Sequence, residues 1–91
     1  PNRAERNITM TIKNICNNCQ LVEMDTNYGR LEIVYSYETP VLSWCGNMWH
    51  RHWDGWSLTT SRHISKAIGR TIQKKEWEQM PVEELKVPTK F

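Results

Sequence analysis

Apolar and polar residues alternate over much of the first two-thirds of the chain, which is the pattern of half-buried β-strands. Residues 31–37 are rich in β-branched and aromatic side chains and predict the strongest strand. Weaker alternation predicts further strands at 20–25, 41–45 and 48–53, and another short segment at 56–58. Together these segments predict a small antiparallel sheet.

Turn-forming residues separate the predicted strands at 25–29, 46–47 and 54–55. Pro40 lacks a backbone donor and therefore favours a bend or a sheet edge. Residues 10–19 carry few aliphatic side chains and fit either a short strand or a turn of helix. The turns suit a β-meander.

A helical period follows, in which apolar side chains recur at the spacing i, i+3, i+4, i+7 and i+8. They are Ile64, Ala67, Ile68, Thr71 and Ile72. This predicts a main amphipathic helix at 60–75, with the hydroxyl residues at 59–61 as candidate caps. Gly69 lies inside it and either allows the sheet to approach closely or ends the helix early. Pro81 near a first turn predicts a short C-terminal helix at 81–86.

The predicted fold class is α+β: an antiparallel meander of three to five strands within residues 10–58, packed by one main helix and followed by a short one. The 91 residues fit a single domain, residues 1–91, and the polar residues 1–9 are expected to lie outside the fold. Only 38% of the residues are hydrophobic, and five tryptophans accompany one phenylalanine. A few large rings are therefore expected to build a small core.

The composition excludes several classes of protein. No apolar run reaches the roughly 18 residues of a membrane span, and no secretory signal is visible. The odd cysteine count argues against a fully paired disulfide framework and for a reduced compartment. Phosphate-binding, zinc-protease and nucleophile-elbow motifs are absent from the sequence. We therefore expect a protein that is not an enzyme.

The predicted helix carries a basic row in which cations recur every four residues: Arg62, Lys66, Arg70 and Lys74. Residues 60–75 hold five formal positive charges and no acid, whereas residues 76–84 hold four acids. The net charge of +2 hides this asymmetry. Such a row neutralises phosphates or meets an acidic protein surface. The alternative is a solvated outer face.

Four tryptophans fall within residues 44–56, interleaved with histidines and Arg51. On a strand, Trp49, Arg51 and Trp53 share one face, and an arginine stacks well between aromatic rings. Rings among cations are typical of single-stranded nucleic-acid binding and of protein interfaces. The alternative is that these rings form the core.

The cysteines also raise the question of a metal. Cys16 and Cys19 are spaced as C-x2-C, and Cys45 and His50 as C-x4-H, which is the inventory of a structural Cys3His zinc site. The spacer after Cys16 lacks the glycine that often turns a zinc knuckle. A free cysteine also buries as a small hydrophobe. We therefore expect no cofactor, with zinc as the minor alternative.

Two segments of the chain resemble a pattern in small uncharacterised phage-encoded proteins. Residues 36–41 have the sequence Ser-Tyr-Glu-Thr-Pro-Val, and residues 57–64 have the sequence Ser-Leu-Thr-Thr-Ser-Arg-His-Ile. The resemblance covers residues 31–69 and implies a viral origin and the cytoplasm of a bacterial host. It also implies a structural role for His63, whose ring would bond back to the sheet and fix the start of the helix.

The leading functional hypothesis is a phage-encoded, non-enzymatic binding protein that acts on a host protein with an acidic surface, for example as an inhibitor of defence or transcription. Its contacts would be the basic row together with Trp49, Arg51 and Trp53. The first alternative is nucleic-acid binding through the same residues, and the second is a zinc-stabilised interaction module. The sequence does not decide between a monomer and a dimer.

Overall fold

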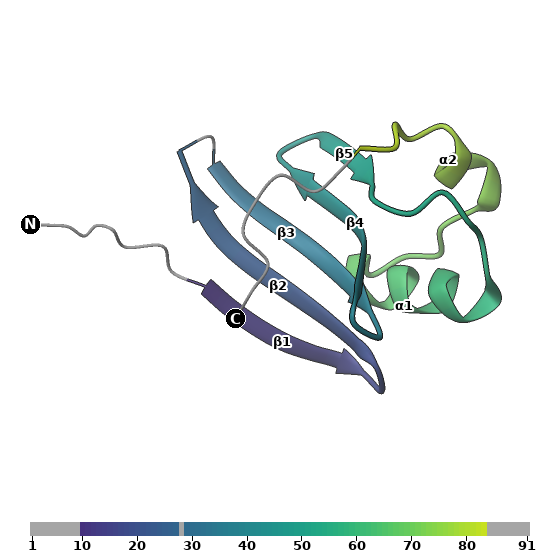
Figure 1. Cartoon of the computed structure of the whole chain (residues 1–91), viewed down its shortest axis with the longest axis horizontal. Coiled ribbons are helices and arrows are strands. Elements are labelled where there is room, and N and C mark those ends of the chain that lie inside the picture. Colours follow the sequence, from purple (N-terminus) through teal and green to yellow (C-terminus); the bar gives the residue numbers. More distant parts are fainter. Residues whose placement is uncertain (1–9, 28, 84–91) are drawn as a thin grey trace, which may run out of the picture.

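The computed structural model describes residues 10–27 and 29–83 as one five-stranded sheet with two helices (Figure 1). The strands are β1 (Met10–Cys16), β2 (Cys19–Thr26), β3 (Gly29–Ser36), β4 (Thr39–Cys45) and β5 (Met48–Arg51), and the helices are α1 (Leu58–Ile68) and α2 (Lys74–Glu78). Neighbouring strands are antiparallel and follow chain order, so the sheet is a meander. The predicted α+β class is confirmed, and the ambiguous segment after residue 10 is a strand.

The first and third hairpin connections lie side by side. Asn17-Asn18 joins β1 to β2, and Tyr37-Glu38 joins β3 to β4. Asn18 and Tyr37 both have a left-handed backbone, with φ of 61° and 60°. The N–H of Tyr37 donates to the carbonyl oxygen of Asn18 at 2.7 Å, which ties the two turns together.

The helices pack on one face of the sheet. Leu21, Val34 and Leu42 lie opposite one another in register, so their side chains share this face. They form the first core cluster with Ile64 of α1 and Trp77 of α2, among others, and several half-buried tryptophans pack against it. A second core cluster, Val22, Met24, Ile33 and Tyr35, lies on the opposite face. The sheet is therefore apolar on both sides.

Helix α1 is shorter than the predicted 60–75. The side chain of Ser57 caps its start by accepting from the N–H of Thr60 at 3.1 Å, so the cap comes before the expected hydroxyl residues. Gly69 ends it with a left-handed φ of 83°, which glycine adopts without the steric cost that a Cβ would bring. The apolar period continues past Gly69 because Ile72 reaches the core from a loop.

Two further predicted elements differ from the structure. Segment 56–58, expected as a strand, holds the cap and the first residue of α1. In the predicted helix 81–86, residues 81–83 form a parallel bridge beside Arg51 of β5 instead, and residues 84–86 lie outside the described part of the chain. The N–H of Arg51 donates to Pro81, and that of Glu83 donates to Arg51, both at 2.8 Å. The short helix lies earlier, at α2.

Candidate binding site

The exposed face of α1 carries two cations of the predicted basic row. Arg62 and Lys66 are one helical turn apart and exposed, whereas Ser61, His63 and Ile64 on the same helix are buried. Neither cation forms an ion pair with another described residue. Their charges therefore remain available to a partner.

A shallow groove of about 370 Å³ runs along these two cations. We call it the α1 groove; its lining residues are Leu58, Ser61, Arg62, Ser65, Lys66, Thr71 and Ile72. It exists because the chain turns back after Gly69, and the N–H of Ile72 donates to Oγ of Ser65 at 3.1 Å. Leu58, at one wall, leaves 65% of its surface exposed. The α1 groove thus combines an exposed apolar side chain with two cations that have no ion pair within residues 10–27 and 29–83.

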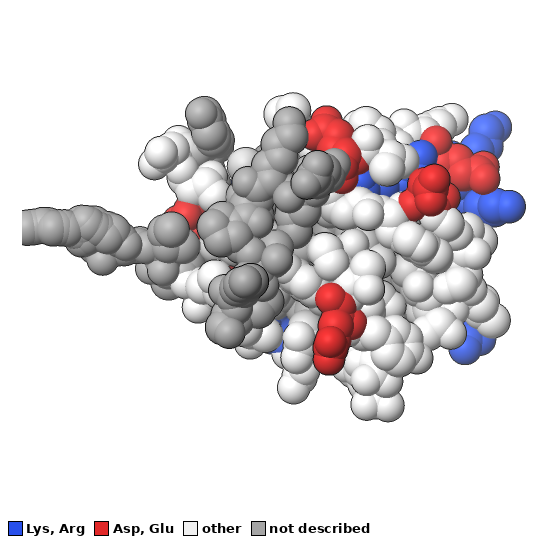
Figure 2. All heavy atoms as spheres, in the orientation of Figure 1, with Lys and Arg blue, Asp and Glu red and all other residues white. Residues whose placement is uncertain are grey.

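The other half of the predicted row is separated from α1 and neutralised. Arg70 follows Gly69, and its guanidinium donates to Oε1 of Glu76 at 3.0 Å. The hydrogen bond and charge of Glu76 raise the pKa of Arg70, while the same hydrogen bond lowers the pKa of Glu76. Lys74 lies 3.9 Å from Glu78 on α2. Blue and red surfaces accordingly alternate over α2 at the upper right of Figure 2.

The predicted aromatic contacts pack within the fold: this holds for Trp49, Arg51 and Trp53. Trp49 and Arg51 share a face, as predicted, but it is the face that packs on the helices. The rings of Trp49 and Trp44 stack at 4.7 Å. Strand β5 ends at Arg51, whose guanidinium lies 5.5 Å from the ring centre of Trp77 and whose Nε donates to Met80 O at 2.9 Å. Trp53 packs against the first core cluster.

The four residues of the zinc hypothesis are not brought together. Cys16 and Cys19 close the first hairpin, whereas Cys45 pairs with Leu31 at the opposite end of the sheet and on its other face. His50 Nε2 lies 3.1 Å from a carboxylate oxygen of Glu83 instead. Within residues 10–27 and 29–83 no three metal-ligating side chains gather. The Cys3His arrangement is therefore wrong for this fold.

Cys19 has a structural contact in place of a ligand role. Its thiol is fully buried and donates to the carbonyl oxygen of His63 at 3.6 Å. Burial, and next the neighbouring Cys16, raise its pKa to about 12. Cys19 therefore stays a neutral thiol that links β2 to α1.

His63 links the two segments of the resemblance. Its Nδ1 lies 2.8 Å from Oγ of Ser36, and both side chains are buried. Its ring also contacts the ring of Tyr37 at 5.9 Å. The expected bond from His63 back to the sheet is confirmed, and it joins segment 36–41 to segment 57–64.

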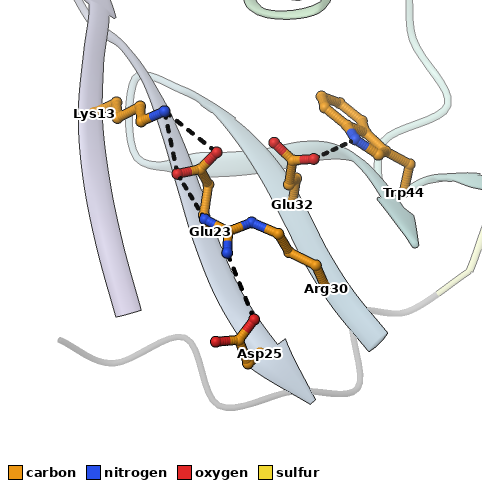
Figure 3. Close-up of polar contacts among 6 residues, drawn as sticks. All are labelled: Lys13, Glu23, Asp25, Arg30, Glu32 and Trp44. Atoms are coloured by element: carbon orange, nitrogen blue, oxygen red, sulfur yellow. Dashed lines mark hydrogen bonds and ion pairs between the residues drawn. The ribbon is translucent and has the colours of Figure 1, made fainter. Parts of the chain in front are cut away.

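The sequence analysis missed a charged network on the helix-bearing face. Glu23 and Glu32 lie directly opposite each other on β2 and β3 (Figure 3). Lys13 and Arg30 approach Glu23 Oε1 at 3.3 and 3.1 Å, and Trp44 Nε1 donates to Glu32 at 2.9 Å. Burial alone would raise the pKa of Glu23, but the hydrogen bonds that it accepts from Lys13 and Arg30 hold it below the ordinary 4.5.

Glu23→Gln is expected to flatten the loss of stability in acid. Because the folded-state pKa of Glu23 lies below its unfolded value, ionised Glu23 stabilises the fold above about pH 4.5, and this contribution disappears as the pH falls through the folded-state pKa. Urea unfolding midpoints at neutral pH and at low pH measure the effect. Glu38→Gln, at an exposed turn outside the network, is the control. A wild-type acid dependence that Glu23→Gln leaves intact would contradict the assignment.

A second missed cluster surrounds Glu83. Oγ of the buried Ser43 lies 2.7 Å from Nε2 of His52, and Nδ1 of His52 lies 2.7 Å from the carbonyl oxygen of Glu83. A carbonyl oxygen only accepts, so Nδ1 of His52 donates to Glu83, while Nε2 shares the second hydrogen bond with the serine hydroxyl. This cluster cannot be predicted from residue spacing in the sequence, because Glu83 is 31 residues from His52.

The fold and these surfaces define a small α+β protein with a meander sheet, helices on one face and a basic groove on α1. The chain belongs to a family of unknown function, DUF8033, whose model matches residues 4–84. Comparison with curated proteins and with solved structures gives no match. Among the described residues, no helix has the length and apolar character needed to cross a membrane.

Proposed function

We propose that the protein is a non-enzymatic binding module that holds an acidic, partly apolar segment of a partner protein in the α1 groove. The observation that carries this proposal is the pair Arg62 and Lys66, exposed and without an ion pair among the described residues, beside the exposed Leu58. Carboxylates of the partner would bind the two cations, and the guanidinium of Arg62 can donate two parallel hydrogen bonds to one carboxylate. An apolar side chain would pack on Leu58.

A protein is favoured over a nucleic acid as this partner. Arg70 and Lys74 already bind acids, and Trp53 packs on the core, so few groups remain for phosphates and bases. Two phosphate contacts would give a slope of only about −1.8 in log affinity against log salt. The likeness of segments 36–41 and 57–64 to phage-encoded proteins supports a bacterial host protein, with inhibition of defence or transcription as the outcome.

Charge reversal in the α1 groove tests the proposal. The double variant Arg62→Glu/Lys66→Glu is expected to weaken binding by about tenfold or more, because attraction becomes repulsion at the contact. The partner is first captured from nuclease-treated bacterial lysate, then purified and titrated against each variant by calorimetry. Lys66→Glu and Lys75→Glu form a matched pair, since Lys75 is an exposed cation on α2 outside the groove.

The outcomes separate the candidate partners. Loss of affinity with Lys66→Glu and retention with Lys75→Glu supports the α1 groove. Equal affinity for wild type and the double variant contradicts it. A partner captured from untreated lysate but lost from nuclease-treated lysate would favour nucleic acid.

A further inference from the structure

A polar depression lies where the two tied hairpin turns meet, apart from the α1 groove. Its volume is about 710 Å³, within the range of roughly 300–1,000 Å³ typical of small-molecule sites. We call it the turn depression; its lining residues are Asn14, Asn18, Gln20, Tyr37, Glu38 and Thr39. None of them lines the α1 groove.

Tyr37 is a costly residue at this position. Its φ of 60° is a conformation that glycine or asparagine adopts more readily than a residue with a large side chain. Tyr37 as a residue is 58% exposed, so it gains little from burial, and its ring contacts the ring of His63. Asparagine adopts this φ more readily than tyrosine and would not expose a large ring. The exposed ring therefore points to a ligand rather than to folding.

The chemistry of the lining narrows the ligand class. Three amides and the hydroxyls of Tyr37 and Thr39 offer both donors and acceptors, and Glu38 supplies the single formal charge of the lining, which disfavours phosphates. Gln20 Nε2 donates to Asn14 Oδ1 at 3.3 Å. This hydrogen bond does not use the side-chain oxygen of Gln20 or the amino group of Asn14. Hydroxyl groups of a sugar match such a surface because each donates and accepts. The face of Tyr37 suits the apolar side of a sugar ring.

A second, smaller hollow adjoins the first. It measures about 210 Å³ and is lined by Ser36, Tyr37, Thr39, Val41, Trp53 and Thr60. Tyr37 and Thr39 line both hollows, at the end of the sheet where β3 joins β4, whereas Gln20 of the first hollow and Ser36 of the second belong to opposite faces of the sheet.

We propose that the turn depression binds a neutral oligosaccharide, with Tyr37 as the stacking residue and the amides of Asn14, Asn18 and Gln20 as its hydrogen-bonding groups. This site is independent of the acidic-segment site on α1, and either proposal can fail alone.

The test begins with the fluorescently labelled full chain on an array of uncharged glycans. Bound glycans are then titrated into ¹⁵N-labelled protein, because the side-chain NH₂ signals of the three amides report directly on the site. We expect saturable shifts of these signals. Tyr37→Asn should weaken binding about tenfold or more without lowering the melting temperature, whereas Tyr37→Phe should retain binding.

Each outcome decides the proposal. An array without binding above background overturns it, as do shifts confined to α1 or glycan affinity unchanged in Tyr37→Asn. Adenosine and uridine are titrated in parallel, and saturable binding of a nucleoside without a glycan would replace the sugar by a nucleobase. A fall in melting temperature for Tyr37→Asn would show that the ring supports the fold and would also overturn it.

Discussion

Trp77→Ala is expected to lower the free energy of unfolding by about 3–5 kcal/mol, because Trp77 is the largest fully buried side chain in the described part of the chain. Trp77 is fully buried in the first core cluster although it belongs to a helix of five residues. The rings of Trp53 and Trp56 pack against it at 6.4 and 6.2 Å. Because small domains are stable by roughly 5–15 kcal/mol, this loss would remove between about a fifth and all of the stability.

Urea unfolding followed by far-ultraviolet circular dichroism measures the effect, and Trp77→Phe separates its causes. The Phe variant keeps most of the ring but loses the hydrogen bond from Nε1 to the carbonyl oxygen of Gly55, at 2.8 Å. A Cβ on Gly55 would lie only 2.6 Å from Cε2 of Trp53, so this corner is closely packed. Trp77→Phe should therefore cost less than Trp77→Ala. A loss below about 1 kcal/mol for the Ala variant would contradict the central role of Trp77.

The sheet was predictable because its determinants are local. Alternating residues such as those of β3 define which side chains face inward, and turn residues such as Gly46 separate one strand from the next. The end of the main helix was less predictable. The apolar period runs on through Ile72, and only the left-handed conformation of Gly69 shows that Ile72 reaches the core from outside the helix.

Trp77 and the free cations illustrate what local patterns miss. The tryptophans of segment 44–56 drew attention as a group, yet the most deeply buried ring comes from α2, outside that group. Of the basic row, Arg62 and Lys66 remain exposed without an acid among the described residues, whereas Arg70 bends back to Glu76. The path of the chain after Gly69 decides which cation meets an acid, and the four-residue spacing of the cations in the sequence does not predict that path.

His63→Ala is expected to lower the free energy of unfolding by about 2–3 kcal/mol, because it leaves a void and deprives the buried Ser36 hydroxyl of its partner. The backbone carbonyl of residue 63 still accepts from the Cys19 thiol, so that link between β2 and α1 is unchanged. His50→Ala is the matched control. His50 is half-buried and binds Glu83 rather than a buried hydroxyl, so its loss should cost less.

A double-mutant cycle distinguishes the Ser36–His63 bond from simple packing. If the bond couples β3 to α1, Ser36→Ala and His63→Ala together should cost about 1 kcal/mol less than the sum of the single variants, because either change alone already breaks the bond. Additive effects would reduce His63 to a space-filling residue. A coupling of the expected size would mean that segments 36–41 and 57–64 support each other as one structural unit, which is the physical reason for the two segments to occur together.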